Sequence, residues 1–159
     1  MAVEISSETT RATPLSIFKV GIVGGGAMGG GIAQVISAAG LPVVIKDLDQ
    51  TLVDKGLRAA YEVYDRRVKK GKLSVNEAEQ KKALISGTLS YDDFRDCDLV
   101  IEAITERMES KKQVFAELDR VLPPSAIIAS NTSALSITEL GRVTGRPAKV
   151  GGLHFFNPA

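Results

Sequence analysis

Three glycines stand at the spacing of a phosphate-binding turn. Gly24, Gly26 and Gly29 follow the pattern G-x-G-x-x-G, between an apolar run typical of a strand and an amphipathic run typical of a helix. In such a turn the first glycine makes a tight bend, the second lets a pyrophosphate approach the backbone, and the third allows helix and strand to pack closely. The N–H groups at the helix start, around Ala27 and Met28, would face the phosphates. The alternative is a glycine-rich turn that binds no ligand. It explains less well why the three glycines stand between a strand-like run and a helix-like run.

A carboxylate follows at the position that completes a dinucleotide-binding unit. Residues 41–47, LPVVIKD, predict a second strand that ends at Asp47, 23 positions after Gly24 and near the ~20 expected. A carboxylate there accepts hydrogen bonds from both ribose hydroxyls and repels a 2′-phosphate, so we expect NAD rather than NADP. Because side chains alternate along a strand, Lys46 should point to the other face, and we do not expect it to favour NADP. An ordinary surface aspartate is the alternative.

Polar side chains follow three later strand-like runs. Ligands bind beyond the carboxyl ends of the strands in folds of this kind, so residues 102–106, 130–133 and 154–158 should gather at one edge. His154 is the only histidine, and imidazole, with a pKa near ~6.5, suits a base that removes a hydroxyl proton. Ser133 could orient the same oxygen. The residues alone leave two alternatives open, namely a packed, hydrogen-bonded histidine and a serine that only caps a turn.

Runs of strand and helix type alternate along the chain, which predicts an α/β fold with a doubly wound, mainly parallel sheet. Ser74 and Ser136 each begin a capping box, in which a glutamate three positions later marks the first turn of a helix. The expected strands are 18–23, 43–47, 87–89, 98–104, 126–130 and 149–155. The expected helices are 27–39, 50–70, 74–84, 111–121 and a short helix from 136.

Length and composition indicate one globular NAD-binding domain. The chain has 159 residues, and we assign 17–159 to this domain and 1–16 to a flexible leader or linker remnant. The formal net charge of +1 argues against a nucleic-acid partner, and no apolar stretch reaches the ~20 residues of a membrane span. Cys97, the only cysteine, excludes an internal disulfide and suits a reducing compartment. We expect no metal site, and a cytoplasmic location, or a mitochondrial or peroxisomal one in a eukaryote.

Four segments together resemble one enzyme family. They are GIVGGGAMGGGIAQ, DLVIEAITE, IIASNTS and GLHFFNP, and the similarity to L-3-hydroxyacyl-CoA dehydrogenases runs from Phe18 to Ala159. VVIKDLDQ resembles more closely the dehydrogenase part of multifunctional fatty-acid oxidation enzymes, or their bacterial relatives. The resemblance implies a Rossmann fold and the NAD-dependent oxidation of L-3-hydroxyacyl-CoA to 3-oxoacyl-CoA. This reaction would serve fatty-acid β-oxidation, its reverse, or hydroxybutyryl-CoA metabolism.

The resemblance also implies roles for individual residues. His154 matches the family's catalytic base, and Ser133 matches the serine that contacts the substrate oxygen beside the nicotinamide. Asp47 matches the acid that binds the adenosine ribose. Lys70 matches a lysine that contacts coenzyme A, although Val63 lies where the family has a second contact, a serine. The remaining matches are cofactor contacts, at Ala103, Glu106, Lys111 and Asn157.

Two features of the family have no match up to Ala159. They are a glutamate that orients the histidine and a C-terminal helical domain that closes the substrate cleft and forms the dimer. We therefore expect the cofactor domain of a longer enzyme, inactive or weakly active by itself. The alternatives are an NAD-binding module without activity, another NAD-dependent hydroxy-acid dehydrogenase on the same scaffold, and a structural protein that kept the fold.

Overall fold

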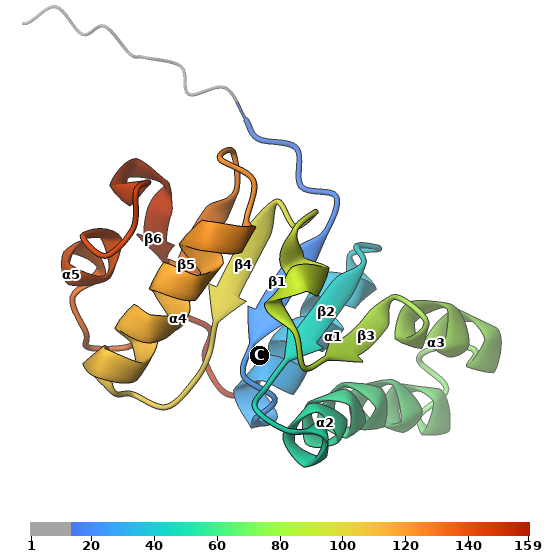
Figure 1. Cartoon of the computed structure of the whole chain (residues 1–159). Coiled ribbons are helices and arrows are strands. Elements are labelled where there is room, and N and C mark those ends of the chain that lie inside the picture. Colours follow the sequence, from blue (N-terminus) through green and yellow to red (C-terminus); the bar gives the residue numbers. More distant parts are fainter. Residues whose placement is uncertain (1–13) are drawn as a thin grey trace, which may run out of the picture.

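A parallel sheet of six strands forms the centre of the computed structural model, which describes residues 14–159 (Figure 1). Residues 1–13, most of the leader expected at 1–16, lie outside the described residues. The strand order is β3-β2-β1-β4-β5-β6, and each pairing between neighbours is parallel. This arrangement confirms the expected α/β, doubly wound fold class. The strands are β1 Val20–Val23, β2 Val43–Lys46, β3 Ile85–Thr88, β4 Leu99–Glu102, β5 Ile127–Ser130 and β6 Val150–Gly152.

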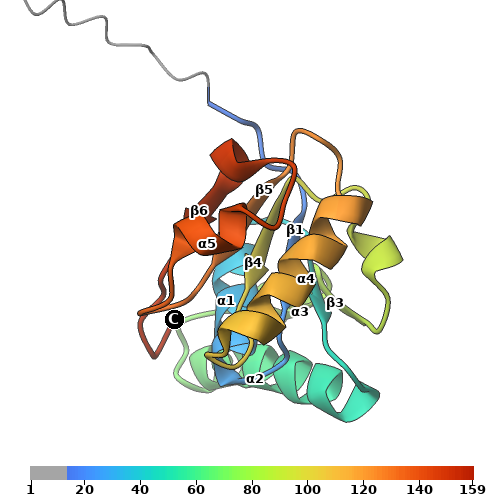
Figure 2. The ribbon, with the colours of Figure 1, turned by 60° about the vertical axis from the view of Figure 1, so that its left-hand side comes forward.

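Helices cover both faces of this sheet (Figures 1 and 2). One apolar core lies between the sheet and α1, α2 and α3, and a second lies between the sheet and α4, α5 and the 3-10 turn η1. Because both faces of the central strands are buried, β1 is apolar on both sides, with Ile22 in the first core and Val23 in the second. The helices are α1 Ala27–Ala38, α2 Gln50–Lys69, α3 Val75–Lys82, α4 Met108–Val121 and α5 Ile137–Gly141, and the 3-10 turns are η1 Tyr91–Phe94 and η2 Pro147–Lys149.

The order of the strands reverses between β1 and β4. From β1 the chain adds β2 and β3 on one side, and it then returns to place β4, β5 and β6 on the other. The connections after β1 and β4 therefore diverge, and they leave a crevice at the carboxyl ends of these two strands, which is where such sheets bind ligands. Since all the strands are parallel, the segments that follow β2, β5 and β6 reach the same edge.

The expected strands and helices are all present, although some bounds differ. The third strand begins at Ile85, two residues earlier than expected, because this side chain packs in the core. The fourth and sixth strands were expected to be longer; they end at Glu102 and Gly152, where the chain leaves the sheet for the ligand edge. α4 begins at Met108, three residues before its expected start. The other bounds agree to within two residues, and neither 3-10 turn was expected.

The two expected capping boxes form to different extents. Ser74 accepts the N–H of Glu77, and the carboxylate of Glu77 accepts the N–H of Ser74, so the first box is complete. Ser136 accepts the N–H of Glu139 in the same way. The carboxylate of Glu139 instead lies 2.6 Å from the ammonium of Lys112, and this contact joins α5 to α4.

We expect Tyr64→Phe to lower the free energy of unfolding by about 1–1.5 kcal/mol. The buried hydroxyl of Tyr64 lies 2.6 Å from Ser37 Oγ and donates to the carbonyl oxygen of Gln34 at 3.1 Å, so it joins α2 to α1. Denaturant unfolding measures the change. Tyr61→Phe is the control, because Tyr61 is half-buried and has no hydrogen-bond partner among residues 14–159; we expect an effect within about 0.5 kcal/mol. Equal effects of the two substitutions would contradict the proposed tie.

Candidate cofactor and substrate site

The glycine-rich loop fits tightly between the ends of β1 and β4. Gly24 has a φ of +120°, a conformation that suits glycine, and a Cβ there would lie 2.6 Å from the carbonyl oxygen of Ala103. A Cβ on Gly29 would collide with the carbonyl oxygen of Gly24. At Gly26, by contrast, a Cβ would meet nothing within 4 Å. The first and third glycines are therefore required by the shape of the loop, while the second keeps a space open in front of α1.

Asp47 ties this loop to the end of β2. Its Oδ2 accepts the N–H of Gly25 at 2.5 Å, and its Oδ1 accepts the N–H of Leu48 at 2.7 Å. The carboxylate is half-buried and lines the same cavity as Gly24 and Gly26. An acid at this position is the one expected to bind the adenosine ribose when a pyrophosphate lies at the start of α1, and this role of Asp47 stays a prediction.

A cavity of about 770 Å³ opens at this edge of the sheet. Its size is that of a site for a small molecule or cofactor. Backbone N–H groups, a carboxylate and apolar side chains line it together, so its residues fit a dinucleotide. The walls come from the ends of β1, β2 and β4 and from one side of α4, and they include Val23, Gly24, Asp47, Ile104, Gln113 and Val114.

Lys46 also lines this cavity, which the expected alternation of side chains did not indicate. Its ammonium lies beside Tyr91 of η1 and donates to the main-chain oxygen of Asp47 at 3.5 Å, and the cavity includes both Lys46 and Asp47. The Lys46 ammonium lies 4.2 Å from the centroid of the Tyr91 ring, and burial lowers the pKa of this lysine below its ordinary value. The preference for NAD over NADP therefore stays a prediction that depends on Asp47.

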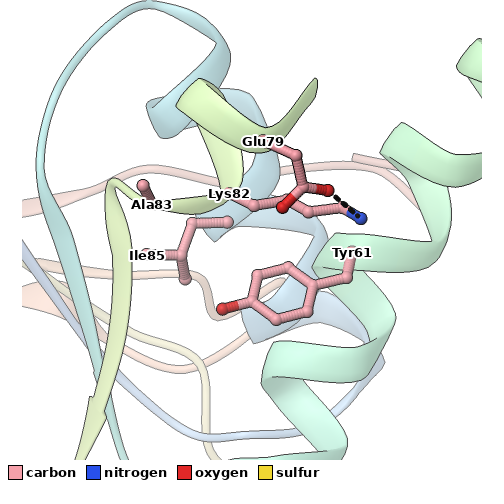
Figure 3. A pocket seen from close by; sticks show the side chains of 5 residues that line it. All are labelled: Tyr61, Glu79, Lys82, Ala83 and Ile85. Carbon is pink, nitrogen blue, oxygen red and sulfur yellow. Dashed lines mark hydrogen bonds and ion pairs between the residues drawn. The ribbon is translucent and has the colours of Figure 1, made fainter. Parts of the chain in front are cut away.

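A smaller cavity of about 330 Å³ lies between α2, α3 and β3 (Figure 3). Its wall includes Ile85, the first residue of β3, so it lies at the amino end of that strand and not at the ligand edge. The ammonium of Lys82 pairs with Asp65 at 2.6 Å and with Glu79 at 3.2 Å. The charged groups at this cavity therefore pair with each other, and the larger cavity is the better candidate for a ligand.

A buried ion pair lies behind the carboxyl end of β4. Glu102, the last residue of the strand, is 0% exposed, and Lys111 of α4 is 1% exposed. Lys111 Nζ donates to Glu102 Oε2 at 2.6 Å, and the same oxygen accepts the N–H of Ile104 at 2.8 Å. Oε1 accepts the hydroxyl of Ser130 at 2.6 Å. Sequence reasoning gave Glu102 no role of its own; the available signal was a carboxylate at the end of the apolar run DLVIE.

Glu106 holds the loop that carries Ser133. Its Oε1 accepts the hydroxyl of Thr132 and, at 3.2 Å, the N–H of Ser133, while its Oε2 lies 3.5 Å from Lys111 Nζ. Burial raises the pKa of Glu106, but the hydrogen bond from Thr132 and the charge of Lys111 outweigh it, so the pKa lies below its ordinary value. Glu106 and Lys111 thus have partners within the protein. Their contact with the cofactor stays a prediction.

Two hydrogen bonds bring the segment around His154 to the loop after β5. The N–H of Leu153 donates to the carbonyl oxygen of Ser130 at 2.9 Å, and the N–H of Phe155 donates to Asn131 Oδ1 at 2.7 Å. His154 lies between these two donors. The structure therefore joins the segment with the expected base to the segment with the expected serine.

The other expected site residues lie at different places. The imidazole of His154 is exposed, with its ring centroid 4.9 Å from that of Phe156. Ser133 and Asn157 are exposed in the segments that follow β5 and β6. Lys70 is not brought to this edge, because it caps the far end of α2, a helix of 20 residues and so about 30 Å long. Its contact with coenzyme A stays a prediction.

Residues 14–159 contain neither a grouping of side chains that could hold a metal ion nor a membrane-spanning helix. In this range no three or more His, Cys, Asp or Glu side chains are grouped so that they could hold a metal ion. In the same range no helix combines the length and the apolar character needed to cross a bilayer. Cys97 is buried, and burial raises the pKa of its thiol to about 12. This thiol is therefore neutral near pH 7 and poorly suited to act as a nucleophile.

The sequence matches one protein family over residues 19–159, the 3-hydroxyacyl-CoA dehydrogenase, NAD binding domain. It is also similar to the peroxisomal fatty acid beta-oxidation multifunctional protein MFP2 of Arabidopsis thaliana. The two are 38% identical over 146 residues, which make up 92% of this chain and 20% of the plant protein. The chain therefore spans about a fifth of the length of that relative.

Solved bacterial structures share this fold. The (S)-3-hydroxybutyryl-CoA dehydrogenase PaaH1 of Ralstonia eutropha is 44% identical, with a TM-score of 0.86 over 90% of this chain and 50% of that one. FadB2 of M. tuberculosis is 40% identical, with a TM-score of 0.87 over 91% of this chain and 51% of that one. The present chain thus spans about half the length of each. Sequence and fold agree: the chain belongs to the 3-hydroxyacyl-CoA dehydrogenase family, as its NAD-binding domain.

Proposed function

We propose that the protein containing this chain oxidises L-3-hydroxyacyl-CoA to 3-oxoacyl-CoA with NAD, in fatty-acid β-oxidation or in the reverse direction. The observation that carries this proposal is a meeting of segments at one edge of the sheet. The glycine-rich loop and Asp47 line one cavity, and hydrogen bonds join the segment around His154 to the loop after β5. The segments proposed to hold a dinucleotide and those proposed to remove a proton from an alcohol thus leave the sheet at the same edge.

The proposed cofactor residues divide by the part of NAD that each would hold. The open space at Gly26 and the N–H groups at the start of α1 suit the pyrophosphate. Asp47 suits the hydroxyls of the adenosine ribose. The nicotinamide end falls to the segments that follow β4, β5 and β6, where the proposed contacts are Ala103, Glu106, Ser133 and Asn157, with the buried Lys111 behind them.

The reaction needs a base and a group that orients the substrate. Bound NAD supplies the hydride acceptor. A ring nitrogen of His154 accepts the hydroxyl proton while the C–H bond on the same carbon breaks, and a carbonyl group forms. The hydroxyl of Ser133 donates a hydrogen bond to that oxygen and directs it toward the imidazole. General-base catalysis of this kind contributes roughly 10²–10⁴-fold to the rate.

The family resemblance supports three further parts of the proposal. Lys70, exposed in the basic segment 66–72, would contact a phosphate of coenzyme A. Dimerisation would use a C-terminal helical domain of the family. The buried single thiol of Cys97 suits a reducing compartment, which we propose to be the cytoplasm, or a mitochondrion or peroxisome in a eukaryote.

A turnover assay beside an NAD titration tests the proposed function. We expect the full-length protein that carries this chain to reduce NAD with L-3-hydroxybutyryl-CoA at more than ~1 s⁻¹, as is usual for enzymes. Binding of NAD without any turnover would favour the alternative of a cofactor-binding module.

Gly26→Val should abolish NAD binding while the fold persists. The new side chain would project into the open space where the pyrophosphate meets the backbone, and a Cβ there meets no protein atom within 4 Å. Thermal melts with and without NAD measure the effect. Gly151→Val in β6 is the control, since a Cβ there also meets nothing within 4 Å, and it should keep the NAD-induced shift. An unchanged shift in Gly26→Val would show that the loop is only a turn.

Asp47→Asn should weaken NAD and relax the preference over NADP. The loss of a charged hydrogen bond to the ribose costs ~1.5–3 kcal/mol, or about 10- to 100-fold in affinity. Asn keeps an acceptor for the N–H of Gly25 and so isolates the effect of charge. Calorimetric titration of both cofactors is the measurement, and Asp54→Asn, which removes an exposed carboxylate on α2, is the control. If the unmutated chain binds NADP as well as NAD, the assignment of Asp47 is wrong.

His154→Ala should lower turnover of the full-length protein by ~10²–10⁴-fold, the range of a general base. The affinity for NAD should stay the same, because the cofactor cavity is not lined by this side chain. Steady-state rates with acetoacetyl-CoA and NADH, together with an NAD titration, check both statements. Near-normal turnover in the variant would remove His154 from the proposed role.

A further inference from the structure

We propose that Glu102, with Lys111 as its counter-ion, is a positioning residue for the nicotinamide half of the cofactor site. Neither side chain lines the cavity. Glu102 instead acts through the three segments that leave the sheet beside it, after β4, β5 and β6. The proposal rests on the proposed function only in placing the nicotinamide against these segments.

The first connection runs from the Glu102 side chain to Ser133. Glu102 Oε1 accepts the hydroxyl of Ser130 at 2.6 Å, and the oxygen of that hydroxyl accepts the N–H of Thr132 at 3.2 Å. Thr132 in turn donates to Glu106, which accepts the N–H of Ser133. Ser130 is 0% exposed, so its hydroxyl has a fixed orientation only while Glu102 accepts it. The loop that presents Ser133 is thus attached to a buried carboxylate.

The second connection uses the main chain of the same residue. The carbonyl oxygen of Glu102 accepts the N–H of Asn131 at 2.8 Å. Asn131 Oδ1 accepts the N–H of Phe155 at 2.7 Å, next to His154. The end of β4 is therefore two hydrogen bonds away from the residue that follows the proposed base.

The third connection orders the segment after Ala103. Glu102 Oε2 accepts the N–H of Ile104 at 2.8 Å, and Lys111 Nζ donates to the carbonyl oxygen of Ile104 at 3.4 Å. The pair thus holds both polar groups of one peptide segment at the wall of the cavity, where Ile104 itself is exposed to the ligand space. A Glu–Lys pair can hold both groups because the carboxylate accepts the N–H and the ammonium donates to the carbonyl oxygen.

Asp47 shares no hydrogen bond with this network, since it bonds to Gly25 and Leu48. The network reaches the wall that Asp47 shares through Ile104 alone, whereas it reaches the segments after β5 and β6 through Ser130 and Asn131. A change at Glu102 should therefore reduce the affinity for NAD more than the affinity for ADP-ribose, which lacks the nicotinamide. A residue that only stabilised the fold would affect both ligands alike.

The experiment compares NAD and ADP-ribose by calorimetry in three proteins: the unmutated chain, Glu102→Gln, and the double variant Glu102→Gln with Lys111→Met. The single variant leaves a buried charge without its partner, and the double variant removes both charges and should melt at a higher temperature than the single one. In both variants we expect NAD to bind about tenfold more weakly or worse. ADP-ribose should lose clearly less affinity than NAD in each variant, because Asp47 shares no hydrogen bond with Glu102 or Lys111.

A matched control uses the next lysine of the same helix. Glu139→Gln with Lys112→Met removes an exposed ion pair between α5 and α4, and both affinities should stay unchanged. Equal losses for NAD and ADP-ribose, no loss for either, or loss of the fold in both variants would each overturn the proposal. So would equal affinity of the unmutated chain for the two ligands. The proposed function is tested separately by the turnover assay, because the affinities for NAD and ADP-ribose can be measured whether or not the protein turns over a substrate.

Discussion

The space between the carboxyl ends of β1 and β4 constrains the rest of the ligand edge. The N–H of Gly24 donates to the carbonyl oxygen of Lys46 at 2.9 Å, and the N–H of Ala103 donates to that of Val23 at 2.8 Å, so three strand ends are joined. A Cβ on Gly24 would lie 2.6 Å from the oxygen of Ala103. The chain must therefore turn into α1 without a side chain, and this closeness places the start of α1 directly beside the residues after β4.

Charge is used differently behind this edge and on the surface. Exposed pairs such as Arg120 with Glu117 contribute roughly 0–1 kcal/mol to stability. The dry pair of Glu102 and Lys111 is different, because losing one partner costs about 3–5 kcal/mol, whereas replacing both with apolar groups is often neutral. Stability therefore does not account for the presence of two charges there. Their bonds to the segments after β4 and β5 do, since apolar groups could not direct those segments.

The sequence predicted most of the fold and the meeting of the glycine-rich loop with Asp47 at one place, because both depend on local patterns. The glycine spacing, Asp47 and the alternation of strand and helix can each be recognised within a few tens of residues. The partner of Glu102 could not be found in this way, because Lys111 faces it only after α4 has packed on the sheet. Lys46 is a similar case. The alternation of side chains along β2 predicted the face of the strand on which Lys46 lies. It could not predict that the cavity reaches this lysine, because the cavity wall includes a residue of η1, which no sequence pattern indicated. The catalytic pairing of His154 with Ser133 came from family resemblance, since neither residue is distinctive alone.

The two halves of the site are built by different means, and this suggests how they separate in function. The proposed adenosine half is held by Asp47 and by the close packing of the glycine-rich loop against Ala103, after β4, and Leu52 of α2. The reacting half depends on β6, a strand of three residues, and on two hydrogen bonds that flank His154. Its imidazole has no hydrogen-bond partner within residues 14–159, whereas the carboxylate of Asp47 has two. Cofactor affinity should therefore tolerate changes around β6 that remove activity, because the close contacts of Gly24, Gly25 and Gly29 involve Ala103, Leu52 and the loop itself and none comes from β6.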